Sequence, residues 1–190
     1  MPANGNDPIR LVLNGERVDV AGVSPQATLL SWLRETRQLP GTKEGCAEGD
    51  CGACTVVVAA SRGDGTLAWK PVNACIRLLP SLDGKAVFTV ESLRAPSGAL
   101  HPVQQALVEC HGSQCGFCTP GIVMRLAALA PLGQAAEGAV RRALAAHLCR
   151  CTGWNTVVEA ACRTPVTTRR DLDAAAQRAR LEGGVDQLVG

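Results

Sequence analysis

The chain has 190 residues, with 46% hydrophobic side chains, 19% charged side chains and a net charge of +2. This length suits one medium domain or two small ones, and the composition excludes a chain that is disordered throughout. The low net charge and the lack of a Lys/Arg block argue against nucleic acid as a partner. Aromatic residues make up only 3%, so a core of Val, Leu and Ala would gain from an additional staple such as a metal centre.

Ten cysteines make disulfides the first alternative to consider. The N-terminus, Met-Pro-Ala-Asn-Gly-Asn-Asp-Pro, has no basic segment followed by an apolar run, so it does not have the pattern of a secretory signal. No apolar run approaches the roughly 18 residues of a membrane span. We therefore expect a cytoplasmic protein without direct membrane insertion, whose cysteines bind metal or take part in redox chemistry.

The first part of the chain, residues 8–91, predicts a small α+β domain. Residues Ile9 to Val20 alternate in polarity around Asn14-Gly15, which is the pattern of a β-hairpin. Ser24 to Leu39 has helical periodicity, which Pro40 ends. Further strands are predicted over Thr55 to Ala60, Thr66 to Lys70 and Ala86 to Glu91. A hairpin, one helix and closing strands match a β-grasp sheet with a helix packed across it.

The loop between the predicted helix and the next strand holds three cysteines and four glycines. With one cysteine further along, the spacing is C-x4-C-x2-C-x20-C, formed by Cys46, Cys51, Cys54 and Cys75. This is the plant-type ligand spacing of a 2Fe–2S cluster. A negatively charged cluster favours backbone N–H groups turned toward its sulfurs, and a tight loop needs positive φ values that glycine adopts without steric cost.

The second part of the chain loses the strand periodicity. Residues 92–99 have the composition of a linker, and residues 100–164 predict a compact four-helix domain. Its helices are expected over Pro102 to Cys110, Gly121 to Ala130, Gly138 to Leu148 and Val157 to Arg163. Residues 165–190 are predicted to form a polar tail.

Four more cysteines lie near the predicted helix ends, in the segments Cys115-Gly-Phe-Cys118 and Cys149-Arg-Cys151. A C-x-x-C pair alone also occurs in zinc sites and thioredoxin-like sites. A structural zinc site is therefore the alternative for this half, although a C-x-C pair is unusual in such sites. The remaining two cysteines have no partner at ligand spacing, and we expect buried free thiols on helical faces: Cys110 and Cys162.

Three longer motifs follow one another along the chain: Gly45-Cys-Ala-Glu-Gly-Asp-Cys-Gly-Ala-Cys-Thr-Val56, Gln114-Cys-Gly-Phe-Cys-Thr-Pro-Gly121 and Cys149-Arg-Cys-Thr-Gly153. Together they resemble the iron–sulfur subunit of molybdenum hydroxylases, the xanthine oxidase family. The resemblance extends from about Ile9 to Arg163, which is nearly all of the chain.

The resemblance implies a ferredoxin-like domain followed by a helical domain, each holding one 2Fe–2S cluster. The first cluster would be held by Cys46, Cys51, Cys54 and Cys75. The second cluster, nearer the molybdenum cofactor, would be held by Cys115, Cys118, Cys149 and Cys151. Gln114 matches a residue that contacts the pterin of that cofactor, and Cys151 matches a ligand hydrogen-bonded to it. A solvent-facing loop residue is the alternative for Gln114.

Two positions depart from the family pattern. The family often has Asn at the position of His147 and Tyr at the position of Trp154, and neither position supplies a cluster ligand in the family. A Rieske-type role for His147 is not expected, because such centres replace two cysteines by two histidines and all eight cysteines are present here. We expect His147 at the C-terminal end of a helix, where a cation is mildly favoured.

Further motifs look closest to xanthine dehydrogenases: Gly41-Thr-Lys-Glu-Gly45, Val72-Asn-Ala-Cys75, His101-Pro-Val-Gln-Gln105 and His111-Gly-Ser-Gln114. The resemblance implies an electron-transfer subunit of a hetero-oligomer, without a catalytic residue of its own. It would relay single electrons from molybdopterin on a large subunit to FAD on a medium subunit, with xanthine or hypoxanthine as the substrate. The alternatives are an aldehyde or N-heterocycle hydroxylase, a free-standing ferredoxin-like shuttle and a zinc-stabilised interaction protein.

Overall fold

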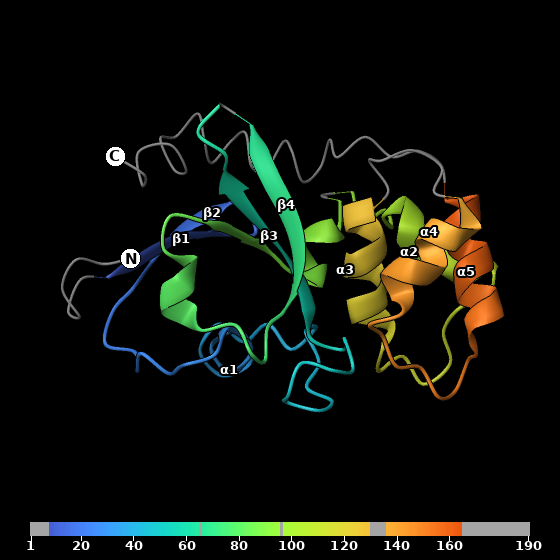
Figure 1. The fold of residues 1–190 in the computed structure, drawn as a ribbon, viewed down its shortest axis with the longest axis horizontal. Helices are drawn as coiled ribbons and strands as arrows, with labels where there is room; N and C mark the ends of the chain where they lie inside the picture. Colours follow the sequence, from blue (N-terminus) through green and yellow to red (C-terminus); the bar gives the residue numbers. More distant parts are fainter. Residues whose placement is uncertain (1–7, 65, 96, 130–135, 165–190) are drawn as a thin grey trace.

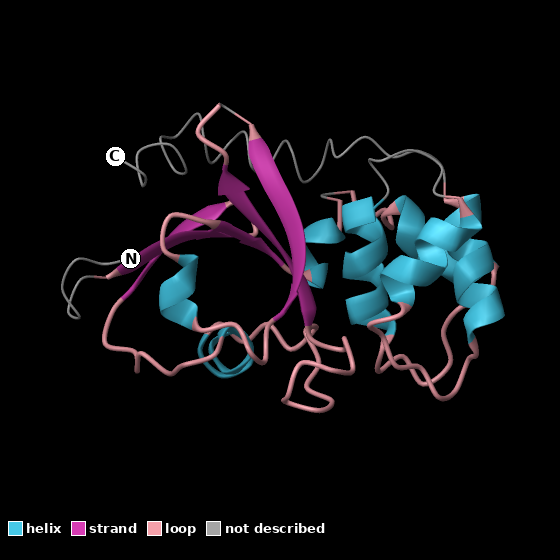
Figure 2. Ribbon diagram, in the orientation of Figure 1, coloured by secondary structure: helices cyan, strands magenta, loops and turns pink. Residues whose placement is uncertain are grey.

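A computed structural model describes residues 8–64, 66–95, 97–129 and 136–164, which form a five-stranded sheet followed by a group of helices (Figures 1 and 2). The strands are β1 (Ile9–Leu13), β2 (Glu16–Val20), β3 (Thr55–Ser61), β4 (Leu67–Asn73) and β5 (Ala86–Phe88). Their order in the sheet is β2-β1-β5-β3-β4, with β1 and β5 parallel and the other neighbours antiparallel. The predicted mixture of strands and helices is confirmed, and the predicted polar tail, residues 165–190, lies outside the described residues.

β1 and β2 form the hairpin that Asn14-Gly15 predicts. The register pairs Ile9 with Val20 and Leu13 with Glu16. Both turn residues have positive φ angles, 52° at Asn14 and 93° at Gly15. Positive φ at both central residues gives a turn whose twist matches that of the two strands.

The helix predicted over residues 24–39 is shorter than expected. It comprises α1 (Leu29–Ser31), which continues as the π-helical turn η1 (Trp32–Thr36). The hydroxyl of Thr28 caps the first turn, which explains the late start because a capping side chain satisfies a backbone N–H group that has no partner in the helix. Gln38 has a φ of 55°, so the chain has left the helical conformation before residue 39.

β4 continues beyond the predicted end at Lys70. Its register with β3 runs from Thr55 opposite Asn73 to Ser61 opposite Leu67, and it includes Pro71. β4 is one of the two edge strands of the described sheet. An edge strand tolerates proline, which cannot donate a hydrogen bond to a neighbouring strand.

β5 ends at Phe88, so the strand predicted to reach Glu91 is wrong at its C-terminal end. The N–H group of Thr89 donates to Asn14 Oδ1 at 2.9 Å, which replaces a strand partner by a side chain. The chain then enters the 3-10 helix η3 (Val90–Leu93).

Within the described residues four helices follow, each overlapping a predicted segment. They are α2 (Pro102–Glu109), α3 (Thr119–Leu129), α4 (Glu137–Leu144) and α5 (Trp154–Arg163). The predicted C-terminus of α4 at Leu148 is wrong by four residues, and α5 begins before the predicted Val157. None of the helices within the described residues is long and apolar enough to cross a membrane.

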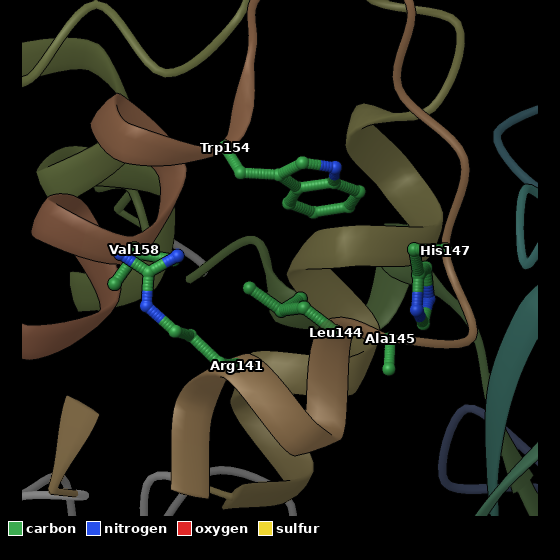
Figure 3. Close-up of a pocket in the computed structure, with 6 residues that line it drawn as sticks. All are labelled: Arg141, Leu144, Ala145, His147, Trp154 and Val158. Carbon is green, nitrogen blue, oxygen red and sulfur yellow. The ribbon is translucent and has the colours of Figure 1, made fainter. Parts of the chain in front are cut away.

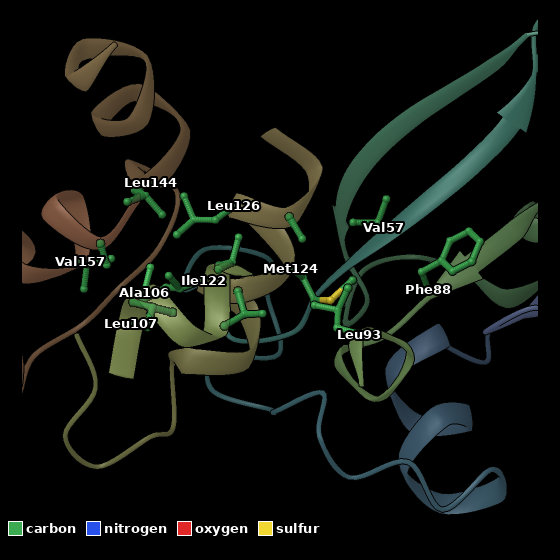
Figure 4. Packing of buried hydrophobic residues seen from close by; sticks show 14 of the residues in the cluster. Val57, Phe88, Leu93, Ala106, Leu107, Ile122, Met124, Leu126, Leu144 and Val157 are labelled. Atoms are coloured by element: carbon green, nitrogen blue, oxygen red, sulfur yellow. The ribbon is translucent and has the colours of Figure 1, made fainter. Parts of the chain in front are cut away.

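Alternating residues of β3 point into two cores on opposite faces of the sheet. Val56 and Val58 belong to the core that α1 and η1 cover, together with Leu29 and Leu33. The other core joins the sheet to the helices, and Figure 4 shows Met124 of α3 and Leu93 of η3 beside side chains of the sheet. Its largest fully buried members include Val57, Phe88, Ile122, Met124 and Leu144. Sheet and helices therefore share one continuous apolar core.

α3 lies so close to the loop before β3 that the two backbones touch. A Cβ atom added to Gly121 would lie 2.2 Å from the carbonyl oxygen of Gly52 and 3.1 Å from that of Ala53. Both glycines are buried. Because backbone atoms cannot move aside as a flexible side chain would, only glycine fits at position 121.

We predict that Gly121→Ala lowers the free energy of unfolding by about 1–3 kcal/mol, the usual cost of inserting a methyl group into a packed core. Gly138→Ala is the matched control, because an added Cβ there would meet only Arg142 Nη1, at 3.5 Å. In an open helical position this change should stabilise the chain by up to about 1 kcal/mol. Urea unfolding of both variants measures the difference, and equal effects at the two positions would contradict the close contact.

Candidate metal centres

The first cysteine set consists of two sulfur pairs. Cys54 and Cys75 are buried, and the Cys54 thiol donates to Cys75 Sγ at 3.3 Å. Cys46 and Cys51 are half-buried, and the backbone N–H of Cys51 donates to Cys46 Sγ at 3.4 Å. The spacing motif therefore folds into one place in the structure, with an inner pair and an outer pair.

The second cysteine set has the same arrangement in a different structural context. Cys115 and Cys118 precede α3, and Cys149 and Cys151 lie between α4 and α5. Cys151 donates to Cys115 Sγ at 3.5 Å, and both are exposed. Cys118 and Cys149 are half-buried, and their side chains lie close enough to shift each other's pKa. This set also divides into an outer pair and an inner pair.

The separations suit thiolates that share a metal ion. Two sulfurs bound at about 2.3 Å to one tetrahedral metal lie about 3.8 Å apart. In the structure, Cys54 and Cys75 Sγ lie 3.3 Å apart, and Cys115 and Cys151 Sγ lie 3.5 Å apart. Small adjustments of side-chain torsions would bring either pair to the ligand distance. In the part of the chain that the structure describes, no three His, Cys, Asp or Glu side chains converge on a single ion; the sulfurs converge in twos.

The loop of the first set stabilises negative charge on its outer sulfur. The pKa of Cys46 is lowered to about 6 because the backbone N–H groups of Glu48 and Cys51 point at its sulfur. Burial, together with the hydrogen bond to Cys54, raises the pKa of Cys75 to about 12. Since metal ligands must be thiolates, metal binding at this set releases protons and is favoured as the pH rises.

The second set repeats this contrast. The pKa of Cys115 is lowered, chiefly by the backbone N–H of Phe117, whereas burial raises the pKa of Cys118 to about 12. Backbone N–H groups that stabilise a thiolate would equally stabilise the negative charge of a bound cluster. The donor groups of both sets therefore fit an anionic metal–sulfur centre.

The glycines of the first loop have the two roles that such a loop requires. Gly49 and Gly52 adopt φ values of 94° and 70°, which side chains disfavour. Gly45 instead makes room for sulfur, because an added Cβ would lie 2.8 Å from Cys51 Sγ. The predicted need for positive φ is confirmed at the first two positions, and close approach explains the third.

A backbone hydrogen bond connects the two cysteine sets. The N–H of Leu148 donates to the carbonyl oxygen of Cys51 at 2.9 Å, and the next residue is Cys149. The two segments of the chain are packed tightly here, since a Cβ added to Gly52 would lie 2.6 Å from the carbonyl oxygen of Ala146. Cys51 of the first set is thus connected to Cys149 of the second set through this hydrogen bond and the backbone of Leu148.

His147 forms a second link at this junction. Its Nε2 lies 3.1 Å from Thr55 Oγ1, and the Thr55 hydroxyl also lies 2.8 Å from the Gly52 carbonyl oxygen, to which it donates. The side chain is only 7% exposed. Burial, followed by the nearby positive charge of Arg125, lowers the His147 pKa to about 4.

The predicted role of His147 as a cation at a helix end is therefore wrong. α4 ends three residues earlier, at Leu144, and His147 is buried and neutral at pH 7. It borders a cavity of about 230 Å³ that Trp154 also lines (Figure 3). The sequence holds no local signal for the contact with Thr55, because the two residues are far apart along the chain and meet only through the packing of the helices on the sheet.

The structure places the remaining candidate residues as follows. Gln114 is exposed and directly precedes Cys115, one of the outer pair of the second set. Cys110 is a buried free thiol, as predicted, whereas Cys162 is only half-buried. Cys110 belongs to the core that the helices share with the sheet, and Cys162 packs against it.

Residues 11–77 match the family model described as a 2Fe-2S iron-sulfur cluster binding domain, and residues 89–162 match a [2Fe-2S] binding domain. The solved structure of quinoline 2-oxidoreductase from Pseudomonas putida 86 contains a chain that is 32% identical, with a TM-score of 0.71. The match covers 94% of this chain and 98% of that chain. The chain belongs to the 2Fe–2S region of the xanthine oxidase family.

Two curated relatives extend this membership. Xanthine dehydrogenase of Drosophila pseudoobscura pseudoobscura is 46% identical over 151 residues, and aldehyde oxidase 1 of Cavia porcellus is 47% identical over 150 residues. These matches cover 77% and 78% of the chain, respectively, but the chain spans only 11% of the length of either relative. The family membership that the motifs predicted is confirmed, and the two identities do not separate the xanthine enzymes from the aldehyde enzymes.

The neutral, buried state of His147 predicts a loss of stability in acid. Between pH 6.5 and 4 the unfolded chain binds a proton at His147 that the folded chain does not, so the free energy of unfolding falls as the pH is lowered. The contribution is about 2 kcal/mol between pH 7 and pH 5. His147→Asn cannot titrate and should lack this part of the pH dependence. Anaerobic urea unfolding of both proteins at the two pH values measures it, and parallel pH profiles would contradict the buried neutral state.

Proposed function

We propose that this chain is the electron-transfer part of a molybdenum hydroxylase. It would relay single electrons through two 2Fe–2S clusters, between a molybdopterin centre on a large partner subunit and FAD on a medium partner subunit. The observation that carries this proposal is the pairing of two separate cysteine sets across one hydrogen bond, from Leu148 to Cys51. The family membership and the two matched 2Fe–2S domains support it.

Each set would hold one cluster, with one sulfur pair on each iron, because a 2Fe–2S cluster bound by four cysteines takes two on each iron. The proposed ligands of the first cluster are Cys46, Cys51, Cys54 and Cys75. Those of the second cluster are Cys115, Cys118, Cys149 and Cys151. The Sγ separations within the pairs and the backbone N–H groups that lower the pKa of Cys46 and Cys115 support this assignment.

We propose a division into a β-grasp ferredoxin domain over residues 8–91, a linker over 92–99 and a four-helix domain over 100–164. The matched ranges, 11–77 and 89–162, support a boundary close to residue 90. The two parts share a hydrophobic core that includes Val57 and Ile122, so we expect them to unfold together. Residues 165–190 would be a separate polar tail.

When bound, the clusters supply reversible one-electron reduction. The residues of this chain hold them, limit their contact with water and set the direction of access. The exposed pair Cys115 and Cys151, beside Gln114, would face the molybdopterin of the large subunit, with Gln114 and Cys151 contacting the pterin. The inner pair would face the junction with the first set, where Cys149 is joined to Cys51 through Leu148.

The alternatives predict different structures around the cysteines. A zinc site would gather four cysteines around one ion, whereas the sulfurs here converge in pairs. A free-standing shuttle would have no need of the helices, which extend the core of the sheet over α2 to α5. Both features favour an electron-relay part of a larger assembly.

For the substrate we propose a purine such as xanthine or hypoxanthine, on the motifs shared with xanthine dehydrogenases. An aldehyde or N-heterocycle is the second candidate. The similar identity to aldehyde oxidase 1, and the match over nearly the full length of a quinoline 2-oxidoreductase chain, support this second candidate.

The ligand assignment predicts which cysteines are needed for iron. Cys54→Ser should remove the first cluster and Cys118→Ser the second, because each substitution takes away a thiolate of a buried or half-buried pair. Each variant should keep about half of the wild-type iron. Cys162→Ser, the matched control, should keep all of it. Iron and acid-labile sulfide per chain measure this, and a full iron content in Cys54→Ser or Cys118→Ser would refute the assignment.

The substrate proposal is tested on the native complex under anaerobic conditions. Adding xanthine should bleach the red-brown cluster absorbance within a turnover time. If xanthine leaves the spectrum unchanged while dithionite bleaches it, the purine assignment fails and the relay survives. Benzaldehyde and quinoline are then the probes for the second candidate.

A further inference from the structure

Glu91 lies where the chain leaves the sheet for the helices, yet its side chain reaches back to the first cysteine loop. One carboxylate oxygen, Oε1, accepts the backbone N–H of Gly41 at 2.8 Å. Gly41 begins the loop that carries Cys46, Cys51 and Cys54. Glu91 falls within the range of the second matched domain, residues 89–162, whereas Gly41 falls within the first, residues 11–77.

The space at Gly41 is shaped for this carboxylate. An added Cβ would lie 2.5 Å from Glu91 Oε1 and 2.6 Å from Val90 Cγ1. The glycine therefore lets η3 approach the loop backbone closely enough for the N–H to reach the carboxylate. The next residue, Thr42, is only 3% exposed, so the start of the loop is part of the packed structure.

The other carboxylate oxygen of Glu91, Oε2, accepts a hydrogen bond from a buried side chain. Thr89, which is fully buried, donates its hydroxyl to Glu91 Oε2. Its Oγ1 also accepts from Asn14 Nδ2 at 3.0 Å, and its N–H donates to Asn14 Oδ1 at 2.9 Å. A hydrogen-bonded chain thus runs from the β1–β2 turn through Thr89 and Glu91 to Gly41. Such connected bonds in a buried setting fix side-chain positions more firmly than isolated ones.

A positively charged side chain, Arg34, also hydrogen-bonds to the backbone at the start of the loop. Arg34 Nη1 donates to the carbonyl oxygens of Thr42, at 2.8 Å, and of Pro40, at 3.1 Å. Glu91 accepts a hydrogen bond from a backbone N–H group of this turn, and Arg34 donates hydrogen bonds to its carbonyl groups. Charge-assisted hydrogen bonds are about twice as strong as neutral ones, so the two side chains together fix the backbone from which the cysteine loop departs.

We propose that Glu91 is a positioning residue for the first metal centre: through Gly41 it holds the first cysteine loop in the shape that binds the cluster, and it makes that shape depend on the segment entering the helices. This inference rests on the proposed binding of one cluster by each cysteine set. It assigns a role to a residue that touches no cysteine and that no spacing motif contains.

The test compares Glu91→Ala, Glu91→Gln and Glu159→Ala in the complete chain. Glu91→Ala removes both hydrogen bonds. Glu91→Gln keeps an oxygen that can accept from Gly41 and should restore most of the wild-type behaviour. Glu159→Ala is the matched control, because Glu159 is an exposed carboxylate paired with Arg163 on one helix, at 2.6 Å.

Iron release to a chelator is followed together with the EPR spectrum after dithionite reduction. In Glu91→Ala, iron of the first cluster should leave about tenfold faster, as expected for the loss of a hydrogen bond to a charged group. In the same variant the EPR signal of the first cluster should change, while that of the second cluster stays as in the wild type. In Glu159→Ala, the rates of iron release from both clusters should stay as in the wild type. The signals are assigned with Cys54→Ser and Cys118→Ser.

The proposal is overturned if Glu91→Ala matches the wild type in both readouts. It is also overturned if both clusters are lost equally as the melting temperature falls, or if Glu91→Gln behaves like Glu91→Ala. In each of these cases the proposed function still stands, provided that the wild-type chain binds two clusters. A wild-type chain that binds no clusters would contradict the proposed function itself, so the two failures are distinguishable.

Discussion

The close contact between the first cysteine loop and the helices is the constraint on which the rest of the structure depends. Gly52 and Gly121 bring two backbones together at a distance that no side chain would permit. The hydrogen bond from Leu148 to Cys51 and the contact between His147 and Thr55 follow from this approach. Because the contact is made by backbone atoms, small shifts of α3 or of the loop are resisted on both sides, and the separation of the two cysteine sets is fixed.

Electrostatics within each set follow from burial and from backbone direction. The outer sulfurs of Cys46 and Cys115 have lowered pKa values because backbone N–H groups point at them, while burial raises those of Cys75 and Cys118. N–H groups directed at sulfur and a low-dielectric surrounding are the means by which a protein tunes an iron–sulfur centre. Short loops therefore carry the proposed ligands and the N–H groups that would tune a cluster, while the sheet and the helices keep those loops in place.

Much of this could be predicted from local sequence. The turn at Asn14-Gly15 and the spacing of the cysteines depend on a few neighbouring residues. The hairpin is predicted correctly, and a close sulfur pair forms within each set, Cys54 with Cys75 and Cys115 with Cys151. Element ends were less predictable, because distant side chains decide them. β5 ends where Thr89 bonds to Asn14, which is remote in sequence.

The residues that sequence reasoning missed act between the two halves of the chain. The solvent-exposed helix end predicted for His147 is instead a buried junction with Thr55, and nothing near either residue in the sequence indicates this. Glu91 was assigned to a strand, although its carboxylate holds Gly41. Periodicity describes which face of an element is apolar, but it carries no information on which other element will cover that face.

We propose that the two cysteine sets each hold a 2Fe–2S cluster and lie side by side across the junction at Cys51 and Leu148. Low-temperature EPR of the native protein, reduced with dithionite and integrated against the number of chains, tests it most directly. We expect two signals of equal intensity, one unpaired spin for each cysteine set. Their mutual broadening should disappear when either Cys54 or Cys118 is replaced by serine. A single signal, or two signals without any magnetic interaction, would contradict it.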